Sequence, residues 1–452
     1  MSDKDRKRAD AVYSALLARQ GEQWVQPRVE RTRRVLEFLD DPQRTFRVVH
    51  VTGTNGKTST SRVIESLVRA HGLRTGLFTS PHLERFTERI MVDGENVADV
   101  AVADAWDEIE PFVEIVDAEL AAADDAPLTF FELLTVLAFV VFADAPVDVA
   151  VIEVGMGGSW DSTNTADGDV AVFSPIDIDH ADRLGNTIAE IAEVKAGIIK
   201  DGAAVVSARQ SPQAEAAIRA AAGARGALVS FEGTDFALTQ QRLAVGGQLV
   251  SVRGLAGTYD DEYLPIYGEH QAFNAALAIA AVESLVGGGT QPIAPDILTE
   301  AFAQVTTPGR LQLAGINPTV LVDAAHNPHG ARALVAALRE SFDFDEWGMV
   351  VGVLADKDAS GIVDALAPAA THIFATAPTS ERASDADSVA DLAEERGLPV
   401  TVHSDLSAAA MAAREWAAAA DRRAVIIAGS VILAGEAIVL ADAEEWKSGW
   451  QE

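Results

Sequence analysis

Short apolar runs alternate with helically spaced segments along most of this chain. Residues 46–51, 147–154 and 170–173 are apolar and rich in β-branched side chains, while 28–40 and 129–143 have the character of helices. Continuous apolar runs of this length are typical of strands buried on both faces of a parallel sheet. Strands that alternate with helices predict an α/β fold with a mostly parallel sheet.

Two further stretches extend this pattern. Residues 226–268 alternate apolar and polar positions and contain many glycines, which predicts a small antiparallel addition. After Thr306-Thr307-Pro308-Gly309 the alternation begins again, with strands expected near 319–323, 348–353, 372–376, 399–402 and 424–428. We therefore expect two domains, residues 1–305 and a second α/β unit of residues 306–452.

The first strand leads into the stretch around which the rest of the chain is organised. It reads Gly53-Thr54-Asn55-Gly56-Lys57-Thr58-Ser59-Thr60, and a helix is expected from Ser61 to Ala70. This is the layout of a phosphate-binding loop, although Val51 stands where the strict motif has its first glycine. Backbone N–H groups and the helix N-terminus of such a loop face an anion. The loop therefore predicts nucleotide binding by Thr54, Asn55, Gly56, Lys57, Thr58 and Ser59.

Composition narrows the classes of function. The 452 residues are 48% hydrophobic, yet they carry a formal net charge of −33. Such a charge disfavours nucleic-acid binding, and it is best tolerated in high salt, where the Debye length falls to about 3 Å at 1 M. The absence of cysteine excludes disulfides and cysteine nucleophiles. With a charged N-terminus and a longest apolar run of only 133–142, we expect a halophilic protein of the cytoplasm, with no signal peptide and no membrane span.

Glu153 and His180 follow predicted strands, where α/β proteins bind their ligands. Glu153 ends the run 147–154, and a carboxylate beside a phosphate-binding loop suits Mg²⁺. A dinucleotide-binding turn is disfavoured there, because the glycines that follow do not form G-x-G-x-x-G. His180, beside Asp179, fits a cation ligand or a helix cap equally well.

Three polar residues stand at positions open to two interpretations. Lys195 lies in an apolar helical segment, where it either faces inward, paired or chemically altered, or snorkels to the surface. Asn274 lies in a helix start whose amides could read a purine edge or could belong to an ordinary helix start. Arg310, at the predicted domain junction, could clamp a phosphate or be an ordinary linker residue.

Together these motifs resemble the folylpolyglutamate synthase/dihydrofolate synthase family of the Mur ligase superfamily. The resemblance covers residues 28–435. The matching motifs are, in order, His50 to Lys57, Ser80 to Leu83 with Glu88 to Ile90, Thr129 to Glu132, Glu153 to Gly158 with Asp161, Thr163 and Asn164, Asp179-His180 with Leu184-Gly185, Lys195 to Ile198, His270-Gln271 with Asn274, Pro308 to Leu311, Asp323 with His326 to His329, and Asp356 to Asp358. Each motif is modest, but their shared order is specific.

The resemblance implies a Mur-ligase-like P-loop domain followed by a C-terminal Rossmann-like α/β domain. It also implies an ATP-dependent ligase of folate biosynthesis. The carboxylate of dihydropteroate or of a tetrahydrofolate polyglutamate takes the γ-phosphoryl group, and the amine of L-glutamate then attacks the acyl phosphate. The implied partners are small molecules alone, with no nucleic acid and no membrane, and the family is often monomeric.

The resemblance also implies roles for individual residues. Lys57, Lys195 and His180 would be catalytic, with Lys195 carbamylated. Mg²⁺ would occupy two sites, one held by Glu153 with Thr58 or Ser59 and one by Ser80, Glu153 and His180; K⁺ is a further candidate cofactor. The nucleotide would also contact Asn274, Arg310, Asp323 and His326, and the pterin would contact Phe131 and Asp161.

Two departures from the family pattern keep alternatives open. Thr58 stands where the family usually has glycine, so either Thr58 or Ser59 could bind Mg²⁺. Ser159-Trp160 replaces an Arg-Leu pair beside Asp161, which leaves the acceptor open. The alternatives are a Mur-type amide ligase with another acceptor, a P-loop NTPase switch or kinase, and a non-catalytic nucleotide-binding module. A switch would need no second α/β domain.

Overall fold

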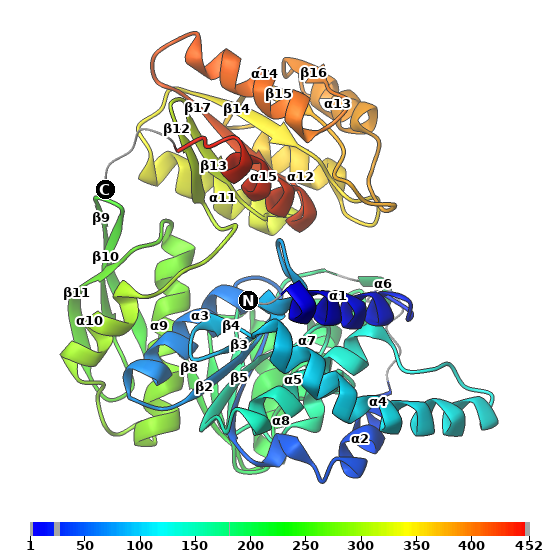
Figure 1. Cartoon of the computed structure of the whole chain (residues 1–452). Helices are drawn as coiled ribbons and strands as arrows, with labels where there is room; N and C mark the ends of the chain where they lie inside the picture. The colour runs from blue at the N-terminus through cyan, green and yellow to red at the C-terminus, as the bar shows by residue number, and fades with distance from the viewer. Residues whose placement is uncertain (1–2, 22–27, 180, 448–452) are drawn as a thin grey trace.

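Three β-sheets organise the computed structural model, which describes residues 3–21, 28–179 and 181–447. An eight-stranded sheet and a three-stranded sheet form from the first two-thirds of the chain, and a six-stranded sheet forms from the remainder. In Figure 1 the six-stranded part, coloured yellow to red, lies above the rest. The predicted fold class is confirmed.

The eight-stranded sheet is mostly parallel, in the order β4-β3-β2-β5-β1-β6-β7-β8. Its central strand β1 (Arg47–Thr52) pairs in parallel with β5 (Val149–Glu153) and with β6 (Val170–Phe173). The other strands are β2 (Thr75–Phe78), β3 (Ile90–Val92), β4 (Glu95–Asn96), β7 (Ala204–Ser207) and β8 (Leu228–Phe231). Only β3 and β4 run antiparallel to their neighbours, at one edge.

Helices cover both faces of this sheet because successive strand residues point to opposite sides. Val49 and Val51 pack into one core with α3 (Lys57–Ala70), α9 (Glu269–Gly287) and α10 (Pro295–Ala303). Val48 packs on the other face, which is covered by α1 (Asp3–Leu17), α2 (Val29–Phe38), α4 (Asp99–Ala122) and α5 (Phe130–Asp144). Beyond β6 this second face is covered by α7 (Ile188–Ala196) and α8 (Pro212–Ala224).

The predicted antiparallel addition exists, but it is shorter than expected. It consists of β9 (Ala237–Ala244), β10 (Gly247–Arg253) and β11 (Thr258–Leu264). Its first predicted residues instead form β8, which pairs in parallel with β7. Helix α8 connects β7 to β8, as the parallel pairing of these two strands requires. The sequence pattern did not predict this helix.

The six-stranded sheet has the order β12-β13-β17-β14-β15-β16. Its strands are β12 (Gln312–Ile316), β13 (Thr319–Val322), β14 (Glu346–Val351), β15 (Ala370–Ala375), β16 (Val400–Val402) and β17 (Arg423–Ala428). One face packs on α11 (Pro328–Ser341), α12 (Ala359–Leu366) and α13 (Ala386–Glu395), and the other on α14 (Leu406–Ala418) and α15 (Val431–Ala443). The antiparallel edge strand β12 was not predicted, because a glycine and an Asn-Pro turn interrupt its short apolar run.

The strand ends of both large sheets face a shared cavity of about 1780 Å³. The loop after β1, Glu153 at the end of β5, and Asp323 just after β13 all line it. Ligands of α/β proteins bind at the carboxyl ends of strands, so the cavity is the candidate site. Among the residues described, no helix is long and apolar enough to cross a membrane.

Candidate functional site

The loop between β1 and α3 takes a shape that only glycine permits at two positions. Gly53 has φ +149°, and a Cβ there would lie 1.9 Å from Oγ of Ser174. Gly56 has φ +84°, and a Cβ there would lie 2.6 Å from Oδ1 of Asn274. Glycine alone adopts such angles at no steric cost. The loop therefore approaches its neighbours closely, including the predicted nucleotide-binding Asn274 on α9.

Helix α3 begins at Lys57 rather than at the predicted Ser61. The small hydroxyl residues in between lack the apolar spacing that marks a helix, which explains the error. The helix N-terminus, with its unpaired N–H groups, therefore lies at the loop itself. Nζ of Lys57 donates to the carbonyl of Thr54 at 3.3 Å, and Oγ1 of Thr54 donates to the carbonyl of Asp177 at 2.9 Å.

Thr58, Ser80 and Glu153 come together beside the loop. Oγ1 of Thr58 lies 3.1 and 3.0 Å from the two carboxylate oxygens of Glu153, and the backbone N–H of Ser80 donates to Glu153 at 3.4 Å. Burial raises the pKa of Glu153, and the charge of Lys57 opposes this. Of the two candidate hydroxyls, that of Thr58 contacts the carboxylate. Ser59 is buried on the same helix and lines the cavity and a small chamber beside it.

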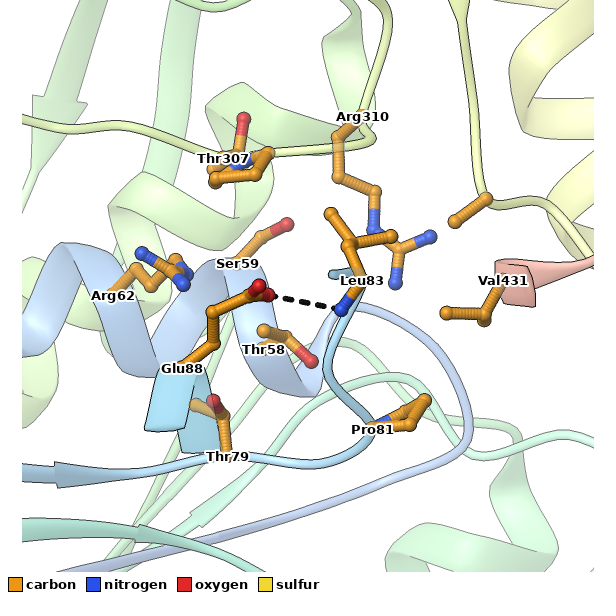
Figure 2. A pocket seen from close by; sticks show the side chains of 12 residues that line it. Thr58, Ser59, Arg62, Thr79, Pro81, Leu83, Glu88, Thr307, Arg310 and Val431 are labelled. Atoms are coloured by element: carbon orange, nitrogen blue, oxygen red, sulfur yellow. Dashed lines mark hydrogen bonds between the residues drawn. The ribbon is translucent and has the colours of Figure 1, made fainter. Parts of the chain in front are cut away.

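This chamber, of about 30 Å³, was not anticipated from the sequence (Figure 2). Arg62 and Arg310 both line it, and in Figure 2 they lie on either side of Ser59. The guanidinium of Arg62 has no hydrogen-bond partner among the residues described, and burial lowers its pKa. Glu88, also in the lining, accepts instead from three backbone N–H groups, those of residues 83 to 85. Two guanidinium groups and the carboxylate of Glu88 thus line the chamber.

Lys195 faces inward, so the snorkelling interpretation is wrong. The residue is 4% exposed, and its Nζ donates to the carbonyl of Gly53 at 2.8 Å. Burial, reinforced by the charge of Lys57, lowers the pKa of Lys195 to about 7. An amine with this pKa is partly neutral near neutral pH and is therefore nucleophilic.

His180 lies outside the described residues, and its predicted role stays a prediction. Asp179, before it, accepts from Nζ of Lys357 at 3.4 Å and from Nδ2 of Asn327 at 3.5 Å. Within the described part of the chain, no three carboxylate or imidazole groups gather as metal ligands. The donors that the structure brings together near the loop are Glu153 and the hydroxyl of Thr58. These hard oxygen donors fit Mg²⁺, which keeps several of its waters and uses few protein ligands.

Asn55, in the phosphate-binding loop, forms hydrogen bonds with residues that follow β13 of the six-stranded sheet. Its Oδ1 accepts from Nδ2 of Asn327 at 3.1 Å, and its Nδ2 donates to Nδ1 of His329 at 2.9 Å. Asn327 is the N-cap of α11, and its side chain also accepts from the N–H of Gly330. The resemblance included Asn327 and His329 without giving them a role; only their contact with Asn55 reveals one.

The predicted nucleotide residues of the second sheet line the cavity with Asn274. Asp323 accepts from the backbone N–H groups of Leu311 and Ala325 at 2.9 and 2.8 Å. Burial raises the pKa of Asp323, and the charge of Arg310 opposes this. Nδ1 of His326 donates to a backbone carbonyl at 3.0 Å, and burial lowers the pKa of His326 to about 4. His326 is therefore neutral near pH 7, with Nε2 as an acceptor.

The predicted pterin residues lie at another part of the cavity. Phe131 packs so closely on the chain after β5 that a Cβ at Gly155 would lie 2.4 Å from its ring. Asp161 accepts from the backbone N–H groups of Met156 and Thr163, at 2.9 Å each, and from the hydroxyl of Thr163. The observed contacts of Asp161 thus hold the loop, and a contact with substrate stays a prediction.

Two family models match the chain. The Mur ligase middle domain matches residues 51–282, and the Mur ligase glutamate ligase domain matches residues 309–431. The dihydrofolate synthase/folylpolyglutamate synthase of Mycobacterium tuberculosis (strain ATCC 25618 / H37Rv) is 43% identical over 439 residues, which are 92% of this chain and 90% of that protein. The protein of the same name from Bacillus subtilis (strain 168) is 34% identical, over 82% and 85% of the two chains.

Solved structures agree with these relatives. The structure of Mycobacterium tuberculosis folylpolyglutamate synthase complexed with ADP superposes with a TM-score of 0.92 at 42% identity, over 97% of this chain and 99% of that one. Escherichia coli FolC in complex with DHPP and ADP gives a TM-score of 0.79 at 29% identity, over 93% and 94%.

Proposed function

The chain belongs to the dihydrofolate synthase/folylpolyglutamate synthase family of ATP-dependent glutamate ligases, and from this premise we propose how its own residues carry out the reaction. The resemblance read from the motifs is thereby confirmed. We propose that the acceptor carboxylate belongs to dihydropteroate, to a tetrahydrofolate polyglutamate, or to both. The observation that carries the proposal is the cavity that unites the phosphate-binding loop and Glu153 with Arg310 and Asp323 from the second α/β unit.

The first step is transfer of the γ-phosphoryl group of ATP to the acceptor carboxylate. Such a transfer needs positioning and neutralisation of charge more than covalent chemistry by the protein. The N–H groups at the start of α3 bind the phosphates, and Lys57 neutralises their charge. Mg²⁺, held by Thr58 and Glu153, would neutralise phosphate charge further; Ser80 and His180 belong to the proposed second site. The proposal thus favours Thr58 over Ser59 as the metal-binding hydroxyl.

Lys195 contacts the phosphate-binding loop through the carbonyl of Gly53. Its amine is buried, bonded to Gly53, and has a pKa of about 7, so a substantial neutral fraction is available to react with CO₂. A carbamate there would replace a buried cation with an anion facing Lys57. We propose that this is the working form of Lys195.

The second step is attack by the amine of L-glutamate on the acyl phosphate, which releases phosphate and forms the amide. The two arginines that line the chamber, Arg62 and Arg310, lie where they can stabilise anionic groups near the loop. Asn274, beside the loop, and Arg310, Asp323 and His326, from the second α/β unit, hold or position the nucleotide. We propose a domain boundary at residues 305 and 306, between α10 and β12, so that the cavity lies between the two domains.

The decisive experiment measures ADP release with ATP and Mg²⁺, with and without L-glutamate and with each acceptor in turn. ADP release that requires both glutamate and dihydropteroate or tetrahydrofolate supports the proposal, with the amide product identified by mass spectrometry. Equal ADP release without acceptor or glutamate would contradict it and favour an NTPase switch. Release with neither pterin, but with another carboxylate, would identify a Mur-type ligase of different specificity.

The working conditions are also part of the proposal. The net charge of −33 suits a cytoplasm rich in KCl, where self-repulsion is screened, and K⁺ would be available as a cofactor. We propose a monomer that binds small molecules alone. A melting temperature that rises from low to molar KCl, and an unchanged monomer mass by light scattering, are the expected results; an unchanged melting temperature would contradict the salt adaptation.

A further inference from the structure

Leu83 belongs to the first α/β unit, but its side chain packs in a core of the second. It lies in the loop between β2 and β3, and it contacts a buried cluster whose other residues all come from 314–446, among them residues of α14 and α15. A Cβ at Gly309 would lie 3.1 Å from Cδ1 and from Cδ2 of Leu83. The loop therefore crosses the boundary between the two units and contacts the turn that carries Arg310.

Gly435, within α15, contacts the same loop. A Cβ there would lie 2.1 Å from the carbonyl oxygen of Leu83 and 2.8 Å from its carbonyl carbon. Gly435 is buried in the interior of the helix, where alanine would be the better helix former. The close approach of a backbone from the other unit explains why the position is glycine, because a side chain would leave no room for the loop.

Glu88 holds the loop in this shape. Its carboxylate accepts from the backbone N–H groups of residues 83, 84 and 85, at 2.9, 2.9 and 2.6 Å. Figure 2 shows the bond to Leu83, with Arg310 and Val431 lining the same chamber. Hydrogen bonds to an ionised carboxylate are stronger than those between neutral groups. Three of them restrain the loop, so Leu83 meets the second unit as a fixed projection.

The turn at Gly309 is bonded to the candidate nucleotide residues. The carbonyl of Gly309 accepts from the N–H of Ala324 at 2.7 Å, and the N–H of Leu311 donates to Asp323 at 2.9 Å. Arg310 lies between these two bonds and lines both the cavity and the chamber. A displacement of this turn would therefore move Arg310 relative to the phosphate-binding loop.

We propose that Leu83 is a positioning residue, which docks between Gly309 and Gly435 and thereby sets the place of Arg310 against the phosphate-binding loop. The inference rests on the proposed function, which assigns Arg310 to the nucleotide. Leu83 acts through the turn and the helix that it contacts. This docking is separate from the hydrogen bonds of Asn55, which connect the phosphate-binding loop to the residues after β13.

Two pairs of variants test the inference. Gly435→Ala adds a methyl group that collides with the carbonyl of Leu83, and Gly223→Ala in α8 is its matched control, because a Cβ there meets nothing within 4 Å. Leu83→Ala removes the projecting side chain, whereas Leu83→Met keeps most of its volume. We expect Gly435→Ala and Leu83→Ala to weaken ADP binding and to lower kcat/KM for ATP, each about tenfold, because a small misplacement of a binding group is costly. Gly223→Ala and Leu83→Met should stay close to the wild type.

Calorimetric titration with ADP supplies a readout that does not depend on turnover. If Leu83 acts through Arg310, Leu83→Ala should weaken ADP binding no further in an Arg310→Ala background, and the melting temperature of Gly435→Ala should not fall. The wild-type affinity for ADP in Gly435→Ala would overturn the inference. So would additive losses in the double variant, or a lower melting temperature in both Gly435→Ala and Leu83→Ala, because these are signatures of a merely structural role.

The same titrations separate this inference from the proposed function. If the wild type shows no glutamate-dependent ADP release, the proposed function fails. The ADP affinities of the variants still decide whether Leu83 positions Arg310.

Discussion

Each of the two large sheets places a carboxylate at a strand end beside the cavity, and the two carboxylates are used differently. Glu153, at the end of β5, faces the hydroxyl of Thr58 and receives one long bond from a backbone N–H. Asp323, just after β13, receives two shorter bonds from the N–H groups of Leu311 and Ala325. Both carboxylates are buried, and burial raises the pKa of each.

The two carboxylates differ because more backbone N–H groups lie within hydrogen-bonding distance of Asp323 than of Glu153. Leu311 has φ +46°, an uncommon angle for a residue with a side chain, and its N–H bonds to Asp323. Asp323 thus holds the turn that carries Arg310 into the cavity. Glu153 has no such turn to hold and remains open to a cation. The rule that ligands bind at strand ends locates both groups, but the neighbouring backbone decides what each one does.

The largest effect should come from the phosphate loop of the first sheet. Lys57→Met removes the charge that, in the proposed mechanism, faces the transferred phosphoryl group, and it keeps most of the side-chain length. We expect kcat/KM to fall about 1000-fold, as it does when a charge-stabilising group is lost from an active site. Steady-state ADP release measures this, and circular dichroism verifies the fold. Activity within a few-fold of the wild type would refute the role of Lys57.

A pair of hydroxyl variants tests the partner of Glu153. Thr58→Val removes the hydroxyl that contacts the carboxylate, and we expect kcat/KM to fall about 100-fold, with a higher requirement for Mg²⁺. Ser59→Ala, the matched control on the next residue, should lower it only a few-fold. Mg²⁺ titrations of both variants measure the difference. A larger loss of kcat/KM in Ser59→Ala than in Thr58→Val would indicate that Ser59, not Thr58, binds the metal.

The carboxylate of the second sheet should act through the turn that it holds. Asp323→Asn keeps the shape but turns an NH₂ group toward one of two buried N–H donors, which costs about 1–3 kcal/mol of unfolding free energy. We expect a lower melting temperature and a KM for ATP raised about tenfold, because Arg310 is displaced. Urea unfolding and ATP titrations measure the two effects. A stability equal to that of the wild type would show that Asp323 does not organise the turn.

The smallest effect is a pH dependence from Lys195. Its pKa is about 7 in the folded chain, against an ordinary value near 10.5, so the neutral amine prevails above pH 7. We expect kcat to rise through pH 7, being about tenfold lower at pH 6 than on the plateau, and bicarbonate to increase it. Because the unfolded chain binds more protons between these two pKa values, the free energy of unfolding should also rise with pH across that window. A kcat that is flat from pH 6 to 8 would argue against the carbamate.

Much of the site could be predicted from local sequence pattern, because the order of strand, glycine-containing loop and helix is enough to identify a phosphate-binding loop. Glu153 and Lys195 stood out for a similar reason, since a charge beside or within an apolar run needs an explanation. Neither the partners of Asn55 nor the place of Arg62 in the small chamber stood out in the sequence. Their significance depends on which distant side chains the tertiary fold brings near, and no spacing along the chain encodes that. Likewise, β8 and β12 were missed as strands of these sheets because short edge strands carry little periodic signal.

Asn55 has a consequence for the release of products. Its side chain is bonded across the cavity while its backbone belongs to the phosphate loop, so separating the two sheets must disturb the loop. Thermodynamic linkage is reciprocal, so a nucleotide that steadies the loop also favours the closed arrangement, to the same extent that closure tightens the nucleotide. We therefore expect the departure of ADP to be coupled to separation of the two sheets, and a coupled step of this kind can limit turnover.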